Sequence, residues 1–284
     1  MARWSKLGLI AGGGTLPQRI ASACTRRAEP IFIVRLKGMA DPALDDYDGE
    51  TCSIAEAGRI IRSLKNANCD AVVLAGLVQR PDFSNLKPDW RGAALLPRII
   101  AAAARGDGAL LNVLVDTLES EGFIVVGAEE ATRDLAAPGG PLGKLSPDEG
   151  QWADIRKAVA VIGALGPFDV GQGAVVASGL VLAIEAAEGT DAMLDRCRAM
   201  STALKGGEGR KGVLVKRPKP GQERRVDLPT IGVETVRRAH AAGLGGVAIE
   251  AGAALIIDAE ETREEADRLG VFVYGFEPSE VRTP

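Results

Sequence analysis

The stretch LGLIAGGGTLP, residues 7–17, joins a short apolar run to a glycine-rich turn and a proline. The apolar run is typical of a buried strand. Pro17 stands where the first turn of a helix tolerates a missing N–H. We therefore expect a strand over residues 7–11 and a helix over residues 16–27, the order in which α/β proteins build a parallel sheet.

The first half of the chain repeats this alternation. Further expected strands lie at residues 31–34, 71–75 and 123–126, and further expected helices at residues 54–64, 93–104 and 109–118. Strands that alternate with helices favour a mostly parallel sheet with helices on both faces. We predict a Rossmann-like N-terminal domain over residues 1–135.

A second α/β domain is expected after a break in this pattern. Two prolines and three glycines within residues 136–143 cannot continue a helix or a strand, so we place a linker at residues 136–144. The second domain, residues 145–284, has expected helices at 148–165, 191–204, 233–242 and 260–269, and expected strands at 174–177, 180–184, 213–215, 247–250, 254–257 and 271–274. The length of 284 residues is about twice that of a usual single domain, which agrees with two domains.

Composition excludes several classes of protein. Lys and Arg total 34 against 38 for Asp and Glu, and this net charge of −4 argues against a general nucleic-acid binder. The longest uncharged run near the middle, residues 170–184, is shorter than the roughly 20 residues of a membrane-spanning helix. We expect no secretory leader, and four cysteines without a CxxC pair favour buried, reduced thiols in the cytoplasm. The single histidine, His240, is interpreted as a helix-surface or capping residue rather than a catalytic one.

The glycine turn at residues 12–14 is a first candidate for binding. Such a turn lets backbone N–H groups approach a phosphate at a helix N-terminus. It is not the dinucleotide fingerprint, because Pro17 stands where G-x-G-x-x-G needs its last glycine, and Arg35 and Lys37 stand where an acidic residue is expected. An NAD-linked oxidoreductase is therefore disfavoured, while a phosphate site and a merely tight turn both stay open.

A basic segment at residues 205–225 is a stronger candidate. It carries eight basic and two acidic residues, a net charge of +6, and its prolines and glycine prevent a regular helix. We expect a strand followed by a loop suited to a pyrophosphate, with a solvated loop as the alternative. The basic residues are Lys205, Arg210, Lys211, Lys216, Arg217, Lys219, Arg224 and Arg225.

Two acidic positions complete the candidates. Asp227 lies between two apolar residues and beside Pro229, and the nearby cations should keep it ionised, as a metal ligand or water-orienting base requires. Glu185, Thr190 and Asp191 follow an apolar strand and precede a helix, a usual place for ligands in α/β sheets. A helix cap is the alternative for Thr190 and Asp191.

Five motifs carry a resemblance to a known family. They are AGGGTLP at residues 11–17, DVGQ at 169–172, VLAIEAAEGTDAML at 181–194, GVLVKRPKPGQ at 212–222 and RVDLPTIG at 225–232. Together they span nearly the whole chain, which resembles the LpxI-type UDP-2,3-diacylglucosamine pyrophosphatases. Gly108 and Glu223 stand where this family often has aspartate, so neither receives an essential role.

The resemblance implies two domains with the ligand between them. It also implies Mg²⁺-dependent cleavage of UDP-2,3-diacylglucosamine, by attack at the lipid-side phosphorus, to UMP and lipid X in lipid A biosynthesis. The resemblance further implies a cytoplasmic protein that acts peripherally at the cytoplasmic face of the inner membrane. The two acyl chains imply an apolar cleft between the domains and transient contact with the membrane surface, with no embedded segment. The oligomeric state stays open, a homodimer included.

The expected site follows from the motifs and the resemblance together. Catalysis is assigned to Asp227, Lys216 and Arg225, and the metal to Asp227 and Glu185. Substrate binding is assigned to Gly13, Gly14, Thr15, Gln172, Thr190, Asp191 and Lys219. Two other functions stay open, a Rossmann-like nucleotide-sugar enzyme and a non-catalytic lipid or nucleotide carrier.

Overall fold

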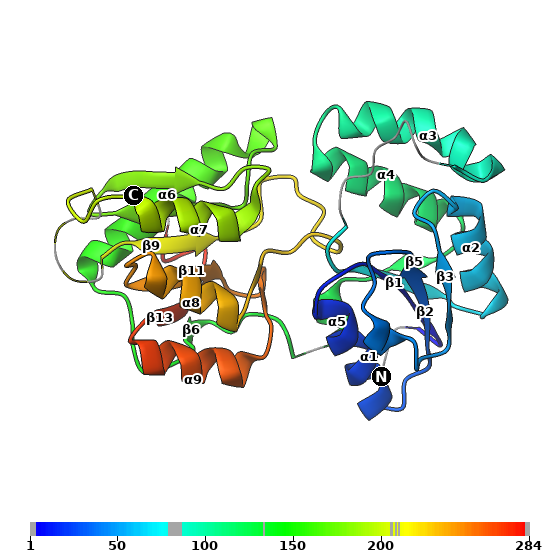
Figure 1. The fold of residues 1–284 in the computed structure, drawn as a ribbon, viewed down its shortest axis with the longest axis horizontal. Helices are drawn as coiled ribbons and strands as arrows, with labels where there is room; N and C mark the ends of the chain where they lie inside the picture. Colours follow the sequence, from blue (N-terminus) through cyan, green and yellow to red (C-terminus); the bar gives the residue numbers. More distant parts are fainter. Residues whose placement is uncertain are drawn as a thin grey trace. The chain divides into compact units, whose positions relative to one another are not determined.

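A computed structural model describes residues 4–78, 87–132, 134–204, 207, 209 and 211–281 (Figure 1). The chain divides into two compact units. The first unit comprises Met1–Asp134 together with Arg225–Asp227, and the second unit comprises Leu135–Arg224 and Leu228–Pro284. Both units are α/β, as the sequence predicts.

The first unit is built on a five-stranded sheet of order β3-β2-β1-β4-β5. All four pairings are parallel, which confirms the parallel sheet predicted from the strand–helix alternation. The strands are β1 (Leu7–Ala11), β2 (Ile31–Leu36), β3 (Gly49–Cys52), β4 (Ala71–Ala75) and β5 (Ile124–Val125).

Helices cover both faces of this sheet. They are α1 (Leu16–Arg26), α2 (Ala57–Asn66), α3 (Trp90–Ala103), α4 (Asp107–Ser120) and α5 (Ala128–Thr132), with a 3₁₀ turn η1 at Pro42–Leu44. Apolar side chains of α2 and α4 pack on the face that carries Ile10, Val34 and Val72. Helices α1 and α5 lie on the other face (Figure 1). Burying both faces explains why β1 and β4 read as continuous apolar runs.

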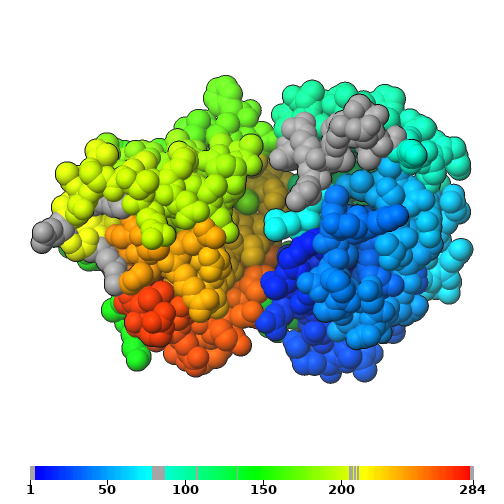
Figure 2. All heavy atoms as spheres, in the orientation of Figure 1, coloured from blue at the N-terminus to red at the C-terminus, as the bar shows by residue number. Residues whose placement is uncertain are grey.

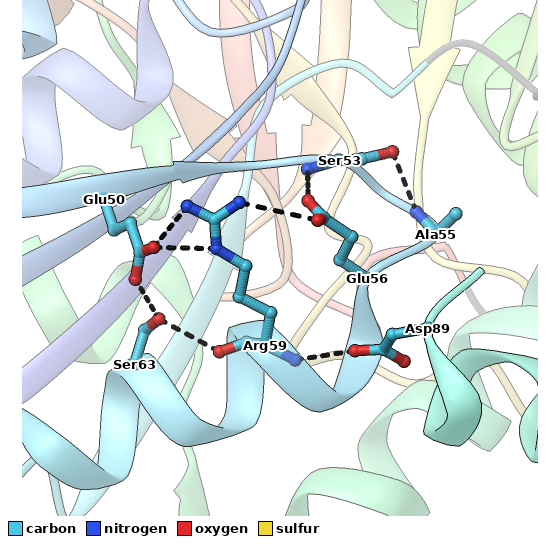
Figure 3. Close-up of polar contacts among 7 residues, drawn as sticks. All are labelled: Glu50, Ser53, Ala55, Glu56, Arg59, Ser63 and Asp89. Atoms are coloured by element: carbon cyan, nitrogen blue, oxygen red, sulfur yellow. Dashed lines mark hydrogen bonds and ion pairs between the residues drawn. The ribbon is translucent and has the colours of Figure 1, made fainter. Parts of the chain in front are cut away.

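A network of polar groups surrounds α2, and Figure 3 shows its contacts with Glu50, Ser63 and Asp89. Arg59 forms an ion pair with Glu50, and the hydroxyl of Ser63 donates to the same carboxylate. The carboxylate of Asp89 accepts from the backbone N–H of Gly92 in α3, at 2.7 Å, and from that of Arg59 in α2, at 2.9 Å. One side chain therefore caps two helices, and it ties the first turn of α3 to α2.

The second unit contains a six-stranded sheet of order β6-β13-β11-β9-β7-β8. Its strands are β6 (Gly140–Pro141), β7 (Gly173–Ala177), β8 (Leu180–Ile184), β9 (Val213–Lys216), β11 (Gly246–Glu250) and β13 (Phe272–Phe276). Strands β9, β11 and β13 are parallel, whereas β7 is antiparallel to both β8 and β9. The β7–β8 hairpin turns through Ser178 and Gly179, both with positive φ, which suits a two-residue hairpin. A separate two-stranded sheet pairs β10 (Thr230–Ile231) with β12 (Leu255–Ile256).

Helices also cover both faces of the larger sheet. Helix α6 (Glu149–Leu165) packs on one face, and α7 (Gly189–Ala199), α8 (Val233–Ala241) and α9 (Ala259–Leu269) pack on the other. A 3₁₀ turn, η3, follows α6 at Gly166–Phe168. Helix α7 ends earlier than the sequence predicts because Met200 takes an extended backbone. His240 lies in the last turn of α8, where it is half-buried, and its Nδ1 is buried with no hydrogen-bond partner among the described residues, so it is not a fully exposed helix-surface residue.

Residues 136–144, predicted as a linker, belong to the second unit. Gly140 and Pro141 form the edge strand β6, paired antiparallel with β13. The N–H of Ala137 donates to the carbonyl of Ala254 at 2.9 Å. Proline is compatible with a strand at the edge of a sheet, where one side needs no donor, so this composition ends helices without excluding a short edge strand.

The four cysteines, all within the described part of the chain, are buried and outside any disulfide, as the sequence predicts. Burial raises the pKa of the Cys69 thiol to about 11 and also raises the pKa of Cys52. Over the residues that the structure describes, no helix is both long and apolar enough to cross a membrane.

Candidate active site

Three polar side chains form a hydrogen-bonded row in the second unit, here called the Lys216 row. Lys216 is only 4% exposed, and its Nζ donates to Thr190 Oγ1 at 2.7 Å and to the carbonyl of Thr230 at 3.2 Å. Thr190 Oγ1 in turn donates to Glu185 Oε1 at 2.7 Å. The buried ammonium and the buried carboxylate are thus connected through one hydroxyl, which satisfies part of the hydrogen-bonding need of both charges.

Strand order explains why these residues meet. Because β7 is antiparallel to both of its neighbours, β8 and β9 run in the same direction and end at the same edge of the sheet. Glu185 directly follows β8, and Lys216 is the last residue of β9. The backbone N–H of Glu185 donates to the carbonyl of Gly173 at 2.8 Å, and a Cβ at Gly173 would lie 2.5 Å from Glu185 Oε2. Glycine at this position therefore makes room for the buried carboxylate.

The helix-cap alternative for Thr190 and Asp191 is wrong. Glu188 occupies the N-cap position of α7, and no side chain caps the helix there. The hydroxyl of Thr190 binds Glu185, and Asp191 Oδ2 lies 3.5 Å from Arg238 Nε. The first turn of α7 therefore carries the partial positive charge of uncapped N–H groups beside the Lys216 row.

One oxygen of Glu185 has no hydrogen-bond partner among the residues that the structure describes. Glu185 is 6% exposed, and its Oε2 is buried without a donor from this part of the chain. An unsatisfied buried carboxylate oxygen is costly, and it is the type of atom that coordinates Mg²⁺. Within the described residues, no three His, Cys, Asp or Glu side chains are grouped to hold a metal. A metal at Glu185 would therefore take most of its ligands from phosphate and water.

The described part of the basic segment lines an open pocket of about 220 Å³. Glu250 ends β11 at the same sheet edge as Lys216, is 6% exposed and binds two arginines. Its Oε2 lies 2.9 Å from Arg217 Nη2, and its Oε1 lies 3.2 Å from Arg224 Nη2. The pocket is lined by Arg217, Pro218, Lys219, Pro220, Gly221, Gln222, Arg224 and Glu250.

Internal contacts hold this loop in shape. Lys219 forms an ion pair with Asp169, and its backbone N–H donates to Gln222 Oε1 at 2.8 Å. Gln222 Nε2 donates to Gln172 Oε1 at 3.2 Å, and the carbonyl of Gln172 accepts from the N–H of Arg217 at 3.0 Å. These bonds bring Gln172 and Lys219 together and argue against the solvated-loop alternative for residues 216–222. Lys205 and Arg210 of the predicted basic segment lie outside the described residues.

Arg225 and Asp227 pack with the first unit. Arg225 Nη1 lies 2.6 Å from Glu119 Oε1, and the intervening Val226 packs on the apolar cluster beneath α2 and α4. Asp227 is half-buried.

The glycine turn of the first unit is mostly explained by close backbone approach. The N–H of Gly13 donates to the carbonyl of Leu77, and the N–H of Leu77 donates to the carbonyl of Gly13, both at 2.8 Å. A Cβ at Gly12 would lie 2.6 Å from the oxygen of Leu77. The N–H of Gly13 is therefore occupied. Gly14, with φ +84°, and Thr15, whose side chain makes no cap of α1, are exposed at the turn.

Glu250 is a further residue of this site that the sequence motifs do not single out. Glu250 ends an apolar run, VAIE, and binds two arginines of the basic segment. The sequence does contain a signal for Glu250, because it stands at the end of an apolar run, as Glu185 does. What the sequence did not show is that β11 lies next to β9.

Comparisons with known proteins agree with the motifs. A sequence model of the LpxI N-terminal domain matches residues 6–135, and one of the LpxI C-terminal domain matches residues 138–274. UDP-2,3-diacylglucosamine pyrophosphatase LpxI of Caulobacter vibrioides is 51% identical over 276 residues, which cover 97% of this chain and 99% of that protein. A solved N5-carboxyaminoimidazole synthase from Aspergillus clavatus shares 12% identity, covering 75% of this chain and 46% of that one with a TM-score of 0.26, too low for any inference. The domain matches and the high identity over both full lengths confirm the resemblance: the chain belongs to the LpxI family.

Proposed function

We propose that this protein hydrolyses the pyrophosphate of UDP-2,3-diacylglucosamine to UMP and 2,3-diacylglucosamine 1-phosphate, as a step of lipid A synthesis. The observation that carries the proposal is the 51% identity to a UDP-2,3-diacylglucosamine pyrophosphatase over nearly the full length of both chains. Because the substrate carries two acyl chains, we expect the enzyme to bind a membrane surface peripherally. The resemblance to the family places this surface at the cytoplasmic face of the inner membrane.

The Lys216 row supports a role at phosphate. Its ammonium is held in place by Thr190 and by the carbonyl of Thr230, so little reorganisation is needed when negative charge develops nearby. The uncapped start of α7 adds partial positive charge beside Thr190. We assign Lys216, together with Lys219 and Arg225, to the neutralisation of charge on the pyrophosphate.

The donor atoms of the chain fit a magnesium ion bound mainly through its substrate. Glu185 Oε2 is a buried oxygen without a hydrogen-bond partner in the described part of the chain, and Asp227 is the second carboxylate that we assign to the ion. Mg²⁺ usually binds proteins through one or two carboxylates and takes its other ligands from phosphate and water. When bound, the ion would neutralise phosphate charge and lower the pKa of a coordinated water.

Asp227 is assigned the decisive role in turnover. A carboxylate near a doubly anionic pyrophosphate repels the substrate, and it is useful there only if it serves a metal ion or orients a water molecule. Removing it should abolish hydrolysis while leaving the binding of intact substrate unchanged or tighter, because the repulsion is removed as well.

The test is UMP release from detergent-dispersed substrate in the presence of Mg²⁺. We expect Asp227→Ala to lower kcat by 10²-fold or more, the usual loss for a general base or metal ligand, and to retain tight substrate binding. Glu264→Ala, an exposed acid on α9, is the matched control and should keep full activity. If Asp227→Ala keeps more than about a tenth of kcat, the assignment is wrong.

The products that the wild-type protein forms distinguish hydrolysis from the two other functions that the sequence left open. A carrier would bind the substrate without releasing UMP, and a nucleotide-sugar enzyme would form a product other than UMP. Excess chelator should abolish UMP release, and added Mg²⁺ should restore it. Full activity in the chelator would remove the metal from the proposal.

A further inference from the structure

Helix α3 exposes an apolar face. It contains two charged residues, Arg91 and Arg98, among fourteen. Trp90 is 72% exposed and Ile100 is 46% exposed. At 100° per residue, the exposed positions gather on one side of the helix, with Arg98 at its margin. The α3 face, as we call it, comprises Trp90, Ala93, Ala94, Pro97, Ile100 and Ala101.

The α3 face is not covered by the elements of the first unit that pack against this helix. Helix α3 packs chiefly against α2 and α4 rather than against the sheet (Figure 1). Its fully buried residues are the small Gly92, Ala102 and Ala103. The α3–α4 hairpin lies on the surface of the unit (Figure 2). A surface helix normally turns charged and polar residues to solvent, and an apolar exposed face marks an interaction site.

The charged residues within α3 and the turn that follows it are all basic. Residues 90–106 contain three arginines and no acidic residue, in a chain of net charge −4, and the flanking acids are Asp89, which caps α2 and α3, and Asp107. Arg98 and Arg105 form no ion pair with any described residue, whereas Arg91 pairs with Glu121 at the end of α4. Of the acids in α4, Glu119 binds Arg225, and Asp116 is exposed. The face therefore presents apolar surface flanked by positive charge.

We propose that the α3 face docks this protein on an anionic lipid surface. An exposed tryptophan, small apolar residues and flanking arginines are the features with which interfacial helices bind the boundary between headgroups and acyl chains. Arginines near the surface are attracted by anionic headgroups, and the net negative charge of the rest of the chain orients the molecule with α3 toward the membrane. A second copy of the chain is a poorer fit, because a two-fold contact on this face would bring the arginines of the two copies together.

The inference rests on the surface of α3, and it adds to the proposed function a way for the enzyme to meet a lipid substrate. It can therefore be tested without substrate. The probe is co-sedimentation of the full chain with vesicles of phosphatidylethanolamine and phosphatidylglycerol, compared with vesicles of phosphatidylcholine alone. The wild-type protein should bind the anionic vesicles, less so at high salt, and should bind the neutral vesicles weakly.

Two variants isolate the apolar and the charged contributions. Trp90→Ser with Ile100→Ser should reduce the partition coefficient on anionic vesicles about tenfold or more, since most of the insertable area is lost. Arg98→Glu should reduce it several-fold at low salt and have little effect at high salt. Phe168→Ser, at a residue 75% exposed in the second unit, is the matched control and should bind like wild type.

Three outcomes would overturn the proposal. They are wild-type protein that does not bind anionic vesicles, a Trp90→Ser/Ile100→Ser variant that binds as wild type does, and equal loss of binding in Phe168→Ser. Light scattering is run alongside: a wild-type dimer that the double variant converts to a monomer, with no vesicle binding, would show that a second copy covers the face. UMP release from detergent-dispersed substrate should be unchanged in the α3 variants, so loss of docking and failure of the proposed function can be told apart.

Discussion

Replacing Thr190 by valine tests how the Lys216 row is held together. Thr190 Oγ1 accepts from Lys216 Nζ and donates to Glu185 Oε1, both at 2.7 Å. Valine keeps the branched shape of threonine but removes both hydrogen bonds. Glu185, whose Oε2 already lacks a partner, would then have neither oxygen bound by a side chain. Lys216 would keep only its bond to the carbonyl of Thr230.

The expected loss of stability follows from those two bonds. A hydrogen bond to a charged group contributes about 1.5–3 kcal/mol, so two of them amount to about 3–6 kcal/mol. Thr190 is half-buried and water can replace part of this, so we expect a decrease of about 3 kcal/mol in the free energy of unfolding. Thr190→Ser keeps the hydroxyl and loses one methyl group, and its decrease should be about 1 kcal/mol.

The assay must report on the second unit alone, because two units need not unfold together. The chain has three tryptophans, and Trp152 belongs to the second unit, where its ring packs edge-on against Tyr274 with centroids 5.2 Å apart. Urea unfolding followed by Trp152 fluorescence, in a Trp4→Phe/Trp90→Phe background, gives the free energy by linear extrapolation.

Two results would refute this account of the row. The first is a Thr190→Val variant whose stability lies within about 0.5 kcal/mol of Thr190→Ser, the level expected of a substitution that removes no important contact. The second comes from the double-mutant cycle with Lys216→Met. Direct contact between the two residues predicts a coupling energy of about 0.5–3 kcal/mol, and additive effects would show that Thr190 and Lys216 act independently.

Two further predictions concern carboxylates outside the site. Asp89→Ala should lower the stability of the first unit by about 1–3 kcal/mol, because the carboxylate caps both α2 and α3, and Asp89→Asn should lose less; urea unfolding followed by far-ultraviolet circular dichroism checks this (Figure 3). Arg268 and Arg237 lower the pKa of Glu265 to about 2, below its unfolded value near 4.5. Its stabilising contribution is therefore complete above about pH 4.5 and is lost as the pH falls toward 2. The urea midpoint, measured from pH 6 down to pH 2.5, should therefore decrease less in Glu265→Gln than in the wild-type protein. Glu264→Gln should show the same decrease as the wild-type protein.

The sequence predicted the elements that bury apolar surface. Strands β1 and β4 were predicted with their observed bounds because each is a continuous apolar run between turns. Strand β3, Gly49–Cys52, was missed because an edge strand of sequence GETC has no such run. The antiparallel direction of β7 relative to its neighbours could not be predicted from the sequence either. The direction of pairing depends on which strands become neighbours and not on the composition of each strand.

The same limit applies to the candidate site. Glu185, Thr190 and Lys216 were each selected from the sequence, but their contact depends on β7 standing between β8 and β9. The short segment from Arg225 to Asp227 shows a second limit. In the sequence this segment directly continues the basic loop. In the structure Val226 packs on the apolar cluster of the first unit, which only the tertiary structure could show.

The four buried thiols can report how often each unit of this molecule opens. Cys24, Cys52 and Cys69 belong to the first unit and Cys197 to the second, and each is shielded from solvent in the native state. A thiol reagent can reach them only when the surrounding structure opens, and burial also suppresses the reactive thiolate of Cys52 and Cys69. Alkylation rates, read cysteine by cysteine by mass spectrometry, would therefore time the opening of each unit separately. A ligand bound within one unit would lower the alkylation rate of the cysteines in that unit and leave the rate in the other unit unchanged.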